Sequence, residues 1–241
     1  MLRRDMARMD TRIRYESRDS VAIITMDDGK VNALSSEMLD ALNGALDRAE
    51  RDGVVVVISG RPGVFSAGFD LPVLQASGPQ AAKMVRAGFE LAERVLSFPT
   101  PVLIGCTGHA VAMGAFLLLS GDYRIGVAGS YKLTANEVAI GLTMPQAAVE
   151  ICRQRLSPAY FNRATTIAEV FSPDEAVAAG FLDRVVSEGA FSEARDGIAG
   201  ELAKLDLASH AATKRRTRAT AIGAIHEAIE SDWAAYPAWQ A

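Results

Sequence analysis

The 241-residue sequence has few of the residues from which metal sites, disulfide frameworks or membrane spans are built. It contains two cysteines, Cys106 and Cys152, which we interpret as reduced thiols because Cys106 stands in an apolar run typical of a core. The three histidines are not at metal-ligand spacing, and we expect His109 to be a polar residue near a strand end that hydrogen-bonds to backbone. The longest stretch without charge, residues 95–121, is interrupted by proline, glycine and His109, so we expect no membrane span.

Several nucleotide-binding and catalytic motifs are also absent. The sequence has no G-x-G-x-x-G after a strand, no Walker loop, no C-x-x-C, no H-E-x-x-H and no G-x-S-x-G. Lysine and arginine (25) are outnumbered by aspartate and glutamate (29), which does not favour a nucleic-acid partner. We interpret the basic run at 214–218 as a solvated helix face, with contact to a phosphorylated small molecule as the alternative. Residues 1–14 predict a frayed N-terminus and no targeting signal, so we expect a cytoplasmic protein.

Strand-like and helix-like segments alternate along most of the chain. Residues 20–26 and the β-branched run at 54–60 predict strands, the second covered on both faces, and Ser35 predicts the start of a helix that ends near 52–53. This alternation predicts an α/β core over residues 1–186. From 187 to 241 the sequence has no strand-like runs, which predicts a helical region that serves in oligomerisation. Its expected helices cover 192–205, 208–218 and 221–236, and its aromatic residues Trp233, Tyr236 and Trp239 are expected to pack on the core or on a second subunit.

Two segments rich in small residues follow predicted strands. They are FSAGFDL at 65–71 and GHAVAMGAF at 108–116. Small residues leave backbone uncovered, and at 113–116 that backbone opens a helix, whose first N–H groups carry partial positive charge. Two such N–H groups that converge would stabilise an oxyanion formed during a reaction. The alternative is that small residues merely allow close packing between strand and helix.

These segments carry a family resemblance. SAGFDL at 66–71, the stretch at 108–125 and ANEVAIGL at 135–142 resemble the crotonase superfamily of enoyl-CoA hydratases and isomerases, and NALSSEML at 32–39 is similar to that family's CoA-binding stretch. The resemblance implies a spiral of ββα units followed by a C-terminal α-helical region, assembled as a homotrimer or a dimer of trimers. It also implies an acyl-CoA substrate, with coenzyme A as part of that substrate, no metal or redox cofactor, and neither nucleic acid nor membrane as a partner.

Site residues can be assigned by matching this sequence to the family's motifs. The resemblance implies that the first oxyanion donor is the N–H of Phe69 and the second that of Met113, with Gly114 as the alternative. A backbone donor at Met113 does not require glycine, provided that Met113 avoids positive φ. The adenine and ribose-phosphate end of CoA would lie against the loops mostly through backbone atoms, at Ala33, Leu34, Ala67, Asp70 and Leu71. Ser66 and Gly68 are also assigned to substrate binding, and the ring of Phe116 would line the acyl pocket.

The acidic residues distinguish between two reactions. Hydratases of this family use two glutamates to activate water; the first position is Phe116 here, and the second is Glu137. The apolar neighbours of Glu137 are expected to raise its pKa toward that of a useful base. A single carboxylate opposite an oxyanion hole suffices for a proton shuttle, so we predict a Δ3,Δ2-enoyl-CoA isomerase. Hydration, thioesterase or related acyl-CoA chemistry, and non-catalytic acyl-CoA binding remain the alternatives.

Overall fold

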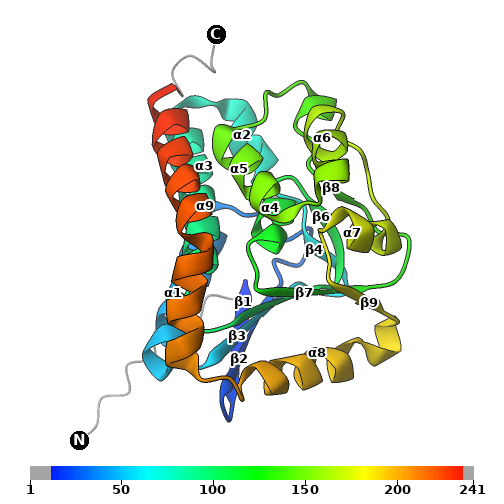
Figure 1. The fold of residues 1–241 in the computed structure, drawn as a ribbon. Helices are drawn as coiled ribbons and strands as arrows, with labels where there is room; N and C mark the ends of the chain where they lie inside the picture. Colours follow the sequence, from blue (N-terminus) through cyan, green and yellow to red (C-terminus); the bar gives the residue numbers. More distant parts are fainter. Residues whose placement is uncertain (1–11, 236–241) are drawn as a thin grey trace, which may run out of the picture.

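Two sheets organise the computed structural model, which describes residues 12–235 (Figure 1). The larger sheet has the strand order β1-β2-β3-β5-β7-β9 and the smaller sheet the order β4-β6-β8. β1 pairs antiparallel with β2, and the later neighbours pair in parallel. The strands are β1 (Ile13–Arg18), β2 (Val21–Met26), β3 (Val55–Ser59), β4 (Gly63–Ser66), β5 (Val102–Cys106), β6 (Gly108–Val111), β7 (Tyr123–Val127), β8 (Leu133–Thr134) and β9 (Arg184–Val186).

Helices follow most pairs of strands. They are α1 (Ser36–Asp52), α2 (Leu71–Ala76), α3 (Gly78–Ser97), α4 (Met113–Leu119), α5 (Gln146–Arg155), α6 (Pro158–Thr166), α7 (Pro173–Ala179), α8 (Glu188–Leu202) and α9 (Leu207–Ala235), with a short 3₁₀ helix η1 (Val138–Ile140). From β3 to β9, consecutive strands alternate between the two sheets. This arrangement confirms the predicted α/β spiral of ββα units.

The predicted strand at 54–60 and the predicted first helix are both confirmed. All five residues of β3 are buried, as expected for a parallel strand covered on both faces. α1 begins after Ser35, whose side chain accepts a hydrogen bond from the N–H of Met38, and it ends at Gly53 in the left-handed conformation.

The N-terminal segment is more ordered than the sequence predicted. Ile13 and Arg14, expected to be frayed, belong to β1, which pairs with β2 through Tyr15 and Ile24. The alternating polar sequence of β1 gave no clear strand signal, because an edge strand draws its stability from the ladder with its neighbour.

The C-terminal region also differs from the prediction. α9 runs without a break from 207 to 235, so the expected interruption near 219–220 is wrong. Ala219 and Thr220 do not end a helix as proline or glycine would, and packing against other helices stabilises α9, with Gly223 inside it, beyond its intrinsic propensity. α9 packs along α3 and α5 of the core (Figure 1). Tyr236 and Trp239 lie outside the described residues.

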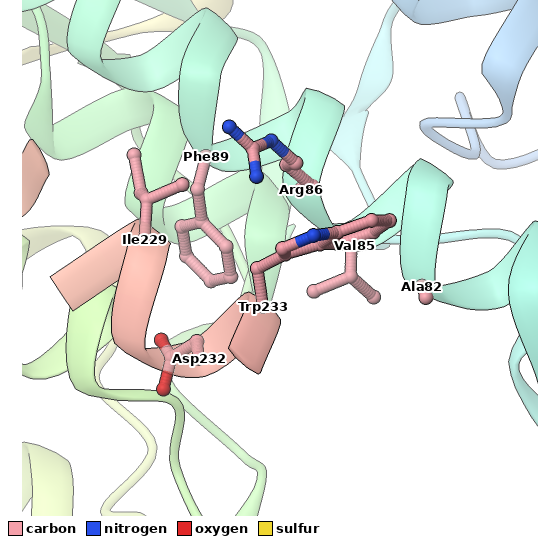
Figure 2. A pocket seen from close by; sticks show the side chains of 7 residues that line it. All are labelled: Ala82, Val85, Arg86, Phe89, Ile229, Asp232 and Trp233. Atoms are coloured by element: carbon pink, nitrogen blue, oxygen red, sulfur yellow. The ribbon is translucent and has the colours of Figure 1, made fainter. Parts of the chain in front are cut away.

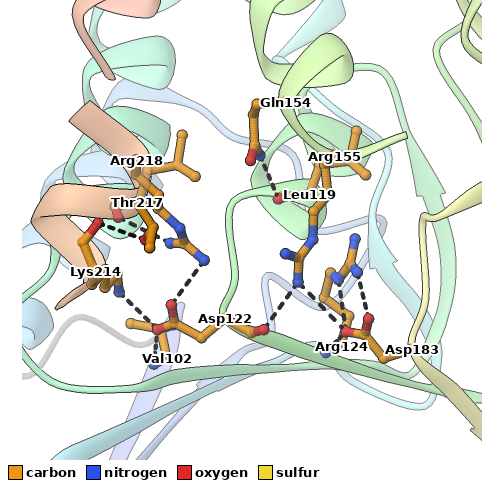
Figure 3. A network of polar contacts seen from close by, with 11 residues as sticks. Val102, Leu119, Asp122, Arg124, Gln154, Arg155, Asp183, Lys214, Thr217 and Arg218 are labelled. Carbon is orange, nitrogen blue, oxygen red and sulfur yellow. Dashed lines mark hydrogen bonds and ion pairs between the residues drawn. The ribbon is translucent and has the colours of Figure 1, made fainter. Parts of the chain in front are cut away.

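A buried ionic network joins α9 to the core and corrects the interpretation of the basic run at 214–218 (Figure 3). Lys214 is 5% exposed, and its Nζ lies 2.7 Å from Asp122 Oδ2; Arg218 lies 2.9 Å from Oδ1 of the same carboxylate. Burial lowers the pKa of Lys214 to about 8, and the charge of Asp122 opposes this shift. Two of the basic residues therefore anchor the helix, while Arg215 and Arg216 are exposed.

Candidate active site

Three loops meet at one edge of the small sheet. Ser66 of β4 pairs with Ala110 of β6, and Val111 of β6 pairs with Thr134 of β8, in parallel register. Because parallel strands end at the same edge of a sheet, the segments that follow them leave the sheet side by side. Phe69, Met113 and Glu137 each lie within three residues of the end of their strand. The fold thus brings together the three residues that the sequence assigned to catalysis.

The loop after β4 lies directly against the start of α4. Gly68 has φ +93°, and a Cβ added to it would lie 3.0 Å from the carbonyl oxygen of Val111 and 3.3 Å from the backbone nitrogen of Met113. A side chain at position 68 would therefore separate the two backbone segments. Glycine at this position lets the segment carrying Phe69 approach the segment carrying Met113.

Both proposed donors have backbone N–H groups outside the regular ladders. Met113 is the first residue of α4, where no intrahelical acceptor exists. In the loop after β4, the N–H of Ala67 donates to the carbonyl of Val31 and the N–H of Gly68 donates to Ser66 Oγ. Among the described residues, the N–H of Phe69 takes no part in these bonds. Both N–H groups are therefore available as hydrogen-bond donors.

The residue before Met113 carries the backbone strain at this helix start. Ala112 has φ +51° and ψ −125°, whereas Met113 is helical. Such a conformation costs a non-glycine residue about 1–3 kcal/mol and is maintained by the surrounding structure. Here the N–H of Ala112 donates to the carbonyl of Thr134 at 3.0 Å. Met113 therefore satisfies the condition on φ stated above.

Gly114, the alternative donor, is packed on its other side against β4. A Cβ at Gly114 would lie 2.5 Å from the carbonyl oxygen of Ser66. Ser66 is fully buried; its Oγ donates to the carbonyl of Asn32 and accepts the N–H of Gly68. The side chain of Ser66, assigned to substrate binding from the sequence, is therefore engaged in holding the loops together.

The other residues assigned to substrate binding differ in exposure. Leu34 is fully buried, and its N–H donates to the carbonyl of Gly68 at 2.8 Å, so the residue joins the two loops and offers no surface to a ligand. Asp70 accepts a hydrogen bond from Val73 as the N-cap of α2. Ala67 and Leu71 are exposed, and Ala33 and Asp70 are half-buried. The structure leaves these four residues accessible at the loop surface.

Asp28 and Asn32 support this surface and were not identified from the sequence. The Asp28 carboxylate accepts hydrogen bonds from the N–H groups of Asn32 and Ala33. Asn32 has φ +52° and is fully buried, and its Nδ2 donates to the carbonyls of Met26 and Phe65. Asp27-Asp28-Gly29 is a common turn-forming sequence, and the hydrogen-bond partners of Asp28 are set by the tertiary fold.

Glu137 is a buried carboxylate, and no counter-charge among residues 12–235 contributes to its pKa. It is 7% exposed, and its Oε2 has no hydrogen-bond partner among the described residues. Burial raises the pKa of Glu137 to about 7, while a bond from its own backbone N–H opposes this shift. The charge of Glu137 adds to burial in raising the pKa of the Cys152 thiol, so α5 lies beside this carboxylate.

An aromatic cluster lies next to the converging loops. The ring of Phe116, 1% exposed, stacks on that of Phe89 with centroids 6.1 Å apart and an interplanar angle of 29°. The ring of Phe69 meets Phe89 edge-on at 6.1 Å. Phe89 comes from α3 and was not identified from the sequence, because its helical spacing is that of an ordinary core residue. The cluster makes the surroundings of Phe69 and Phe116 apolar.

The histidine at 109 and the two cysteines have structural roles. His109 Nδ1 accepts a hydrogen bond from the N–H of Lys132 at 3.0 Å, which confirms the expected backbone contact. Cys106 and Cys152 are buried free thiols.

Within residues 12–235, no three acidic, histidine or cysteine side chains are grouped so that they could share a metal ion. In the same part of the chain, no helix combines the length and apolar character needed to cross a bilayer.

Comparison with known proteins agrees with this fold. The family model described as enoyl-CoA hydratase/isomerase matches residues 16–237. A solved structure named as an enoyl-CoA isomerase of Mycobacterium tuberculosis is 48% identical, with a TM-score of 0.89, and covers 93% of this chain and 98% of that one. A probable enoyl-CoA hydratase of Rhodobacter capsulatus is 30% identical over 84% of this chain and 79% of its own length. The mitochondrial enoyl-CoA delta isomerase 1 of Rattus norvegicus is 29% identical over 73% of this chain, and the match spans 63% of the rat protein.

The fold and these matches define a protein of the crotonase superfamily, which confirms the resemblance stated from the sequence. The chain belongs to the enoyl-CoA hydratase/isomerase family. Its relatives include proteins named as isomerases and proteins named as hydratases, so membership indicates an acyl-CoA enzyme without choosing between the two reactions.

Proposed function

We propose that this protein isomerises 3-enoyl-CoA thioesters to 2-enoyl-CoA thioesters. The ionised carboxylate of Glu137 removes a proton from C2 of the substrate. The thioester oxygen becomes the oxyanion of a dienolate and accepts hydrogen bonds from the N–H groups of Phe69 and Met113. Glu137 then returns the proton to C4, so that the double bond moves from C3–C4 to C2–C3. The reaction moves one proton and consumes no water, metal ion or redox cofactor.

The observation that carries this proposal is the single buried carboxylate at the loop edge. The pKa of Glu137 is raised by burial, and no second carboxylate contributes to that shift among the described residues. A base with a pKa of about 7 is ionised in half of the molecules near neutral pH and is strong enough to accept a proton. Phe116 occupies the position of a hydratase's other glutamate and is itself buried in the aromatic cluster. An apolar ring there excludes the water that hydration requires.

Assembly is a further part of the proposal. We infer that the chain forms a homotrimer or a dimer of trimers, because large apolar side chains stay exposed on the segments after Glu137 and after α6. These side chains are Val138, Ile140, Leu142, Ile167 and Val170.

The test is a panel of assays on one preparation. Wild-type protein is expected to convert 3-enoyl-CoA substrates and to hydrate crotonyl-CoA slowly or not at all. Glu137→Gln is expected to lower isomerisation by roughly 10²-fold or more while CoA affinity is retained, since the amide cannot accept the C2 proton. Glu201→Gln, at an exposed glutamate of α8, is the matched control and should leave turnover unchanged.

Each rival predicts a different pattern. Efficient hydration of crotonyl-CoA by wild type would favour a hydratase, and release of free CoA would favour a thioesterase. Acyl-CoA binding without turnover of either enoyl substrate would favour a non-catalytic binder. Near-normal isomerisation by Glu137→Gln would show that Glu137 is not the base.

A further inference from the structure

Gly88 stands in the middle of α3, where glycine weakens a helix relative to alanine. The residue is buried, and its open side faces the ring of Phe69 and the side chain of Met113. A Cβ added to Gly88 would lie 2.5 Å from Cζ of Phe69, closer still to Cε1, and 3.5 Å from Cγ of Met113. The ring of Phe69 therefore occupies the space that any other residue at position 88 would fill, and we call this space the Gly88 seat.

The Gly88 seat joins the two residues whose N–H groups are the proposed oxyanion donors. The ring of Phe69 lies in the seat, and the side chain of Met113 borders it. The backbone of Phe69 is held from another side, because the residue forms an isolated parallel bridge with Leu34. A ring displaced from the seat must leave its side-chain rotamer or move the backbone that carries the N–H. The position of the Phe69 donor relative to the Met113 donor thus depends on the contact at Gly88.

The helix that provides the seat is fixed by its neighbours. α3 packs against α1, α4 and α9, and Phe89, the next residue along it, meets the ring of Phe69 edge-on with centroids 6.1 Å apart. The Arg86 guanidinium of α3 lies 5.1 Å from the centroid of the Trp233 ring of α9 (Figure 2). The cavity between these two helices has a volume of about 10 Å³, close to the least that holds one water molecule. A methyl group added at Gly88 would therefore displace the ring of Phe69 and not α3.

We propose that Gly88 is a positioning residue of the oxyanion hole, and that the Gly88 seat fixes the N–H of Phe69 relative to that of Met113. This inference rests on the proposed function for the role of the two N–H groups. Gly88 has no side chain to offer the reacting atoms and acts through the ring of Phe69. Because a hydrogen bond weakens steeply as its geometry departs from linear, a displaced Phe69 would leave the thioester oxygen with one good donor.

The first test is the rate of isomerisation. For Gly88→Ala, kcat on 3-enoyl-CoA is expected to fall roughly 10²-fold, the effect of a misplacement of about 1 Å. Phe69→Leu keeps the backbone N–H but removes the ring atoms that the added methyl group would meet. Gly88→Ala in the Phe69→Leu background should therefore lose only a few-fold relative to Phe69→Leu alone, which is a coupling between the two positions.

The second test does not depend on turnover. Butyryl-CoA carrying ¹³C at the thioester carbonyl is saturated, so it binds without being isomerised, and isotope-edited infrared spectroscopy reports its carbonyl stretching band. Two hydrogen bonds to the carbonyl oxygen should move the wild-type band to lower wavenumber than that of the free thioester. Gly88→Ala should lose at least half of this shift. Phe69→Ala empties the seat without adding an atom to α3, and it should lose a similar part of the shift.

The matched control is Gly44→Ala, a glycine-to-alanine change inside α1 where an added Cβ meets no atom within 4 Å. It should leave both kcat and the carbonyl band as in wild type. A wild-type rate and band in Gly88→Ala or in Phe69→Ala would overturn the proposal. So would an equal loss from Gly88→Ala in the Phe69 and Phe69→Leu backgrounds, because the methyl group would then act through some other contact. A wild type that shifts the band without isomerising 3-enoyl-CoA would contradict the proposed isomerase and leave the role of Gly88 standing.

Discussion

At the scale of single residues, the site contains groups that oppose the stability of the fold. Glu137 is buried with an unpartnered carboxylate oxygen, and Ala112 has a positive φ directly before α4. The unpartnered carboxylate and the positive φ each destabilise the folded state. Glutamine at position 137 and glycine at position 112 would reduce these costs. Such costs are concentrated at functional sites, where a desolvated base and a displaced backbone serve the chemistry.

The cost at Glu137 predicts a stabilising substitution. Its pKa is about 7 in the folded protein, against an ordinary value of 4.5, so between these values the folded state binds more protons than the unfolded state. The free energy of unfolding therefore falls as the pH rises from 4.5 to 7. Glu137→Gln should be more stable than wild type by roughly 2–3 kcal/mol at pH 8 and nearly equal to it at pH 4. Urea denaturation at both pH values measures this. A difference that does not change with pH would show that Glu137 is not desolvated.

A change at Phe116 tests why one carboxylate suffices. Phe116→Glu should admit water and place a second carboxylate near Glu137. We expect slower isomerisation, weak hydration of crotonyl-CoA and a stability loss of about 2–4 kcal/mol. Phe116→Gln is the matched control, since it is polar but supplies no base, and it should not gain hydration. A folded Phe116→Glu variant with unchanged isomerisation would show that residue 116 does not face the substrate.

Motif residues of the site could be assigned from the sequence, whereas supporting residues could not. Phe69, Met113 and Glu137 stand in short motifs that are recognisable in the sequence, and the structure brings them to one sheet edge. Phe89 and Asn32 act through contacts with residues distant in sequence. Their chemistry is that of ordinary core and turn residues, so only the fold distinguishes them.

At the scale of elements, local signals explain some helices and strands and miss others. α1 was predicted because its N-cap, apolar spacing and terminal glycine all agree. β8 contains only two residues, and no periodicity exists over so short a span. α9 was predicted as two helices, because the sequence could not show that packing on α3 and α5 would stabilise a continuous one.

The attachment of α9 to the core predicts a large effect at Asp122. This carboxylate pairs with Lys214 and Arg218 and accepts the N–H of Val102 at 2.7 Å. Asp122→Ala would leave two largely buried cations without a partner, and we expect a loss of about 3–5 kcal/mol in the free energy of unfolding. Asp47→Ala is the control, because its pair with Arg94 is exposed and contributes about 1 kcal/mol or less. Equal losses in the two variants would mean that the network does not anchor the helix.

At the scale of the whole molecule, several exposed apolar side chains lie on two segments near the site. Val138, Ile140 and Leu142 follow Glu137 directly, and Ile167 is 68% exposed. The two segments are neighbours, since Thr134 Oγ1 donates to the carbonyl of Ala168. Exposed apolar side chains on such segments, here called the patch, are typical of a surface that another subunit covers.

This patch predicts that assembly and activity are linked. Wild-type protein at micromolar concentration should show, by light scattering, three or six times the mass of one chain. Ile140→Asp places a charge in the patch and should give monomers, since burying an unpaired carboxylate costs more than the apolar contact contributes. Activity should fall with it, because the N–H of Ile140 donates to the carbonyl of Glu137 at 3.1 Å and the turn that holds the base is part of the patch. Val177→Asp, at an exposed valine on α7, should leave the mass unchanged. A monomeric wild type with full turnover would show that the patch is needed neither for assembly nor for catalysis. Monomers of Ile140→Asp that regain activity at high concentration would show that the subunit contact itself orders the turn around Glu137.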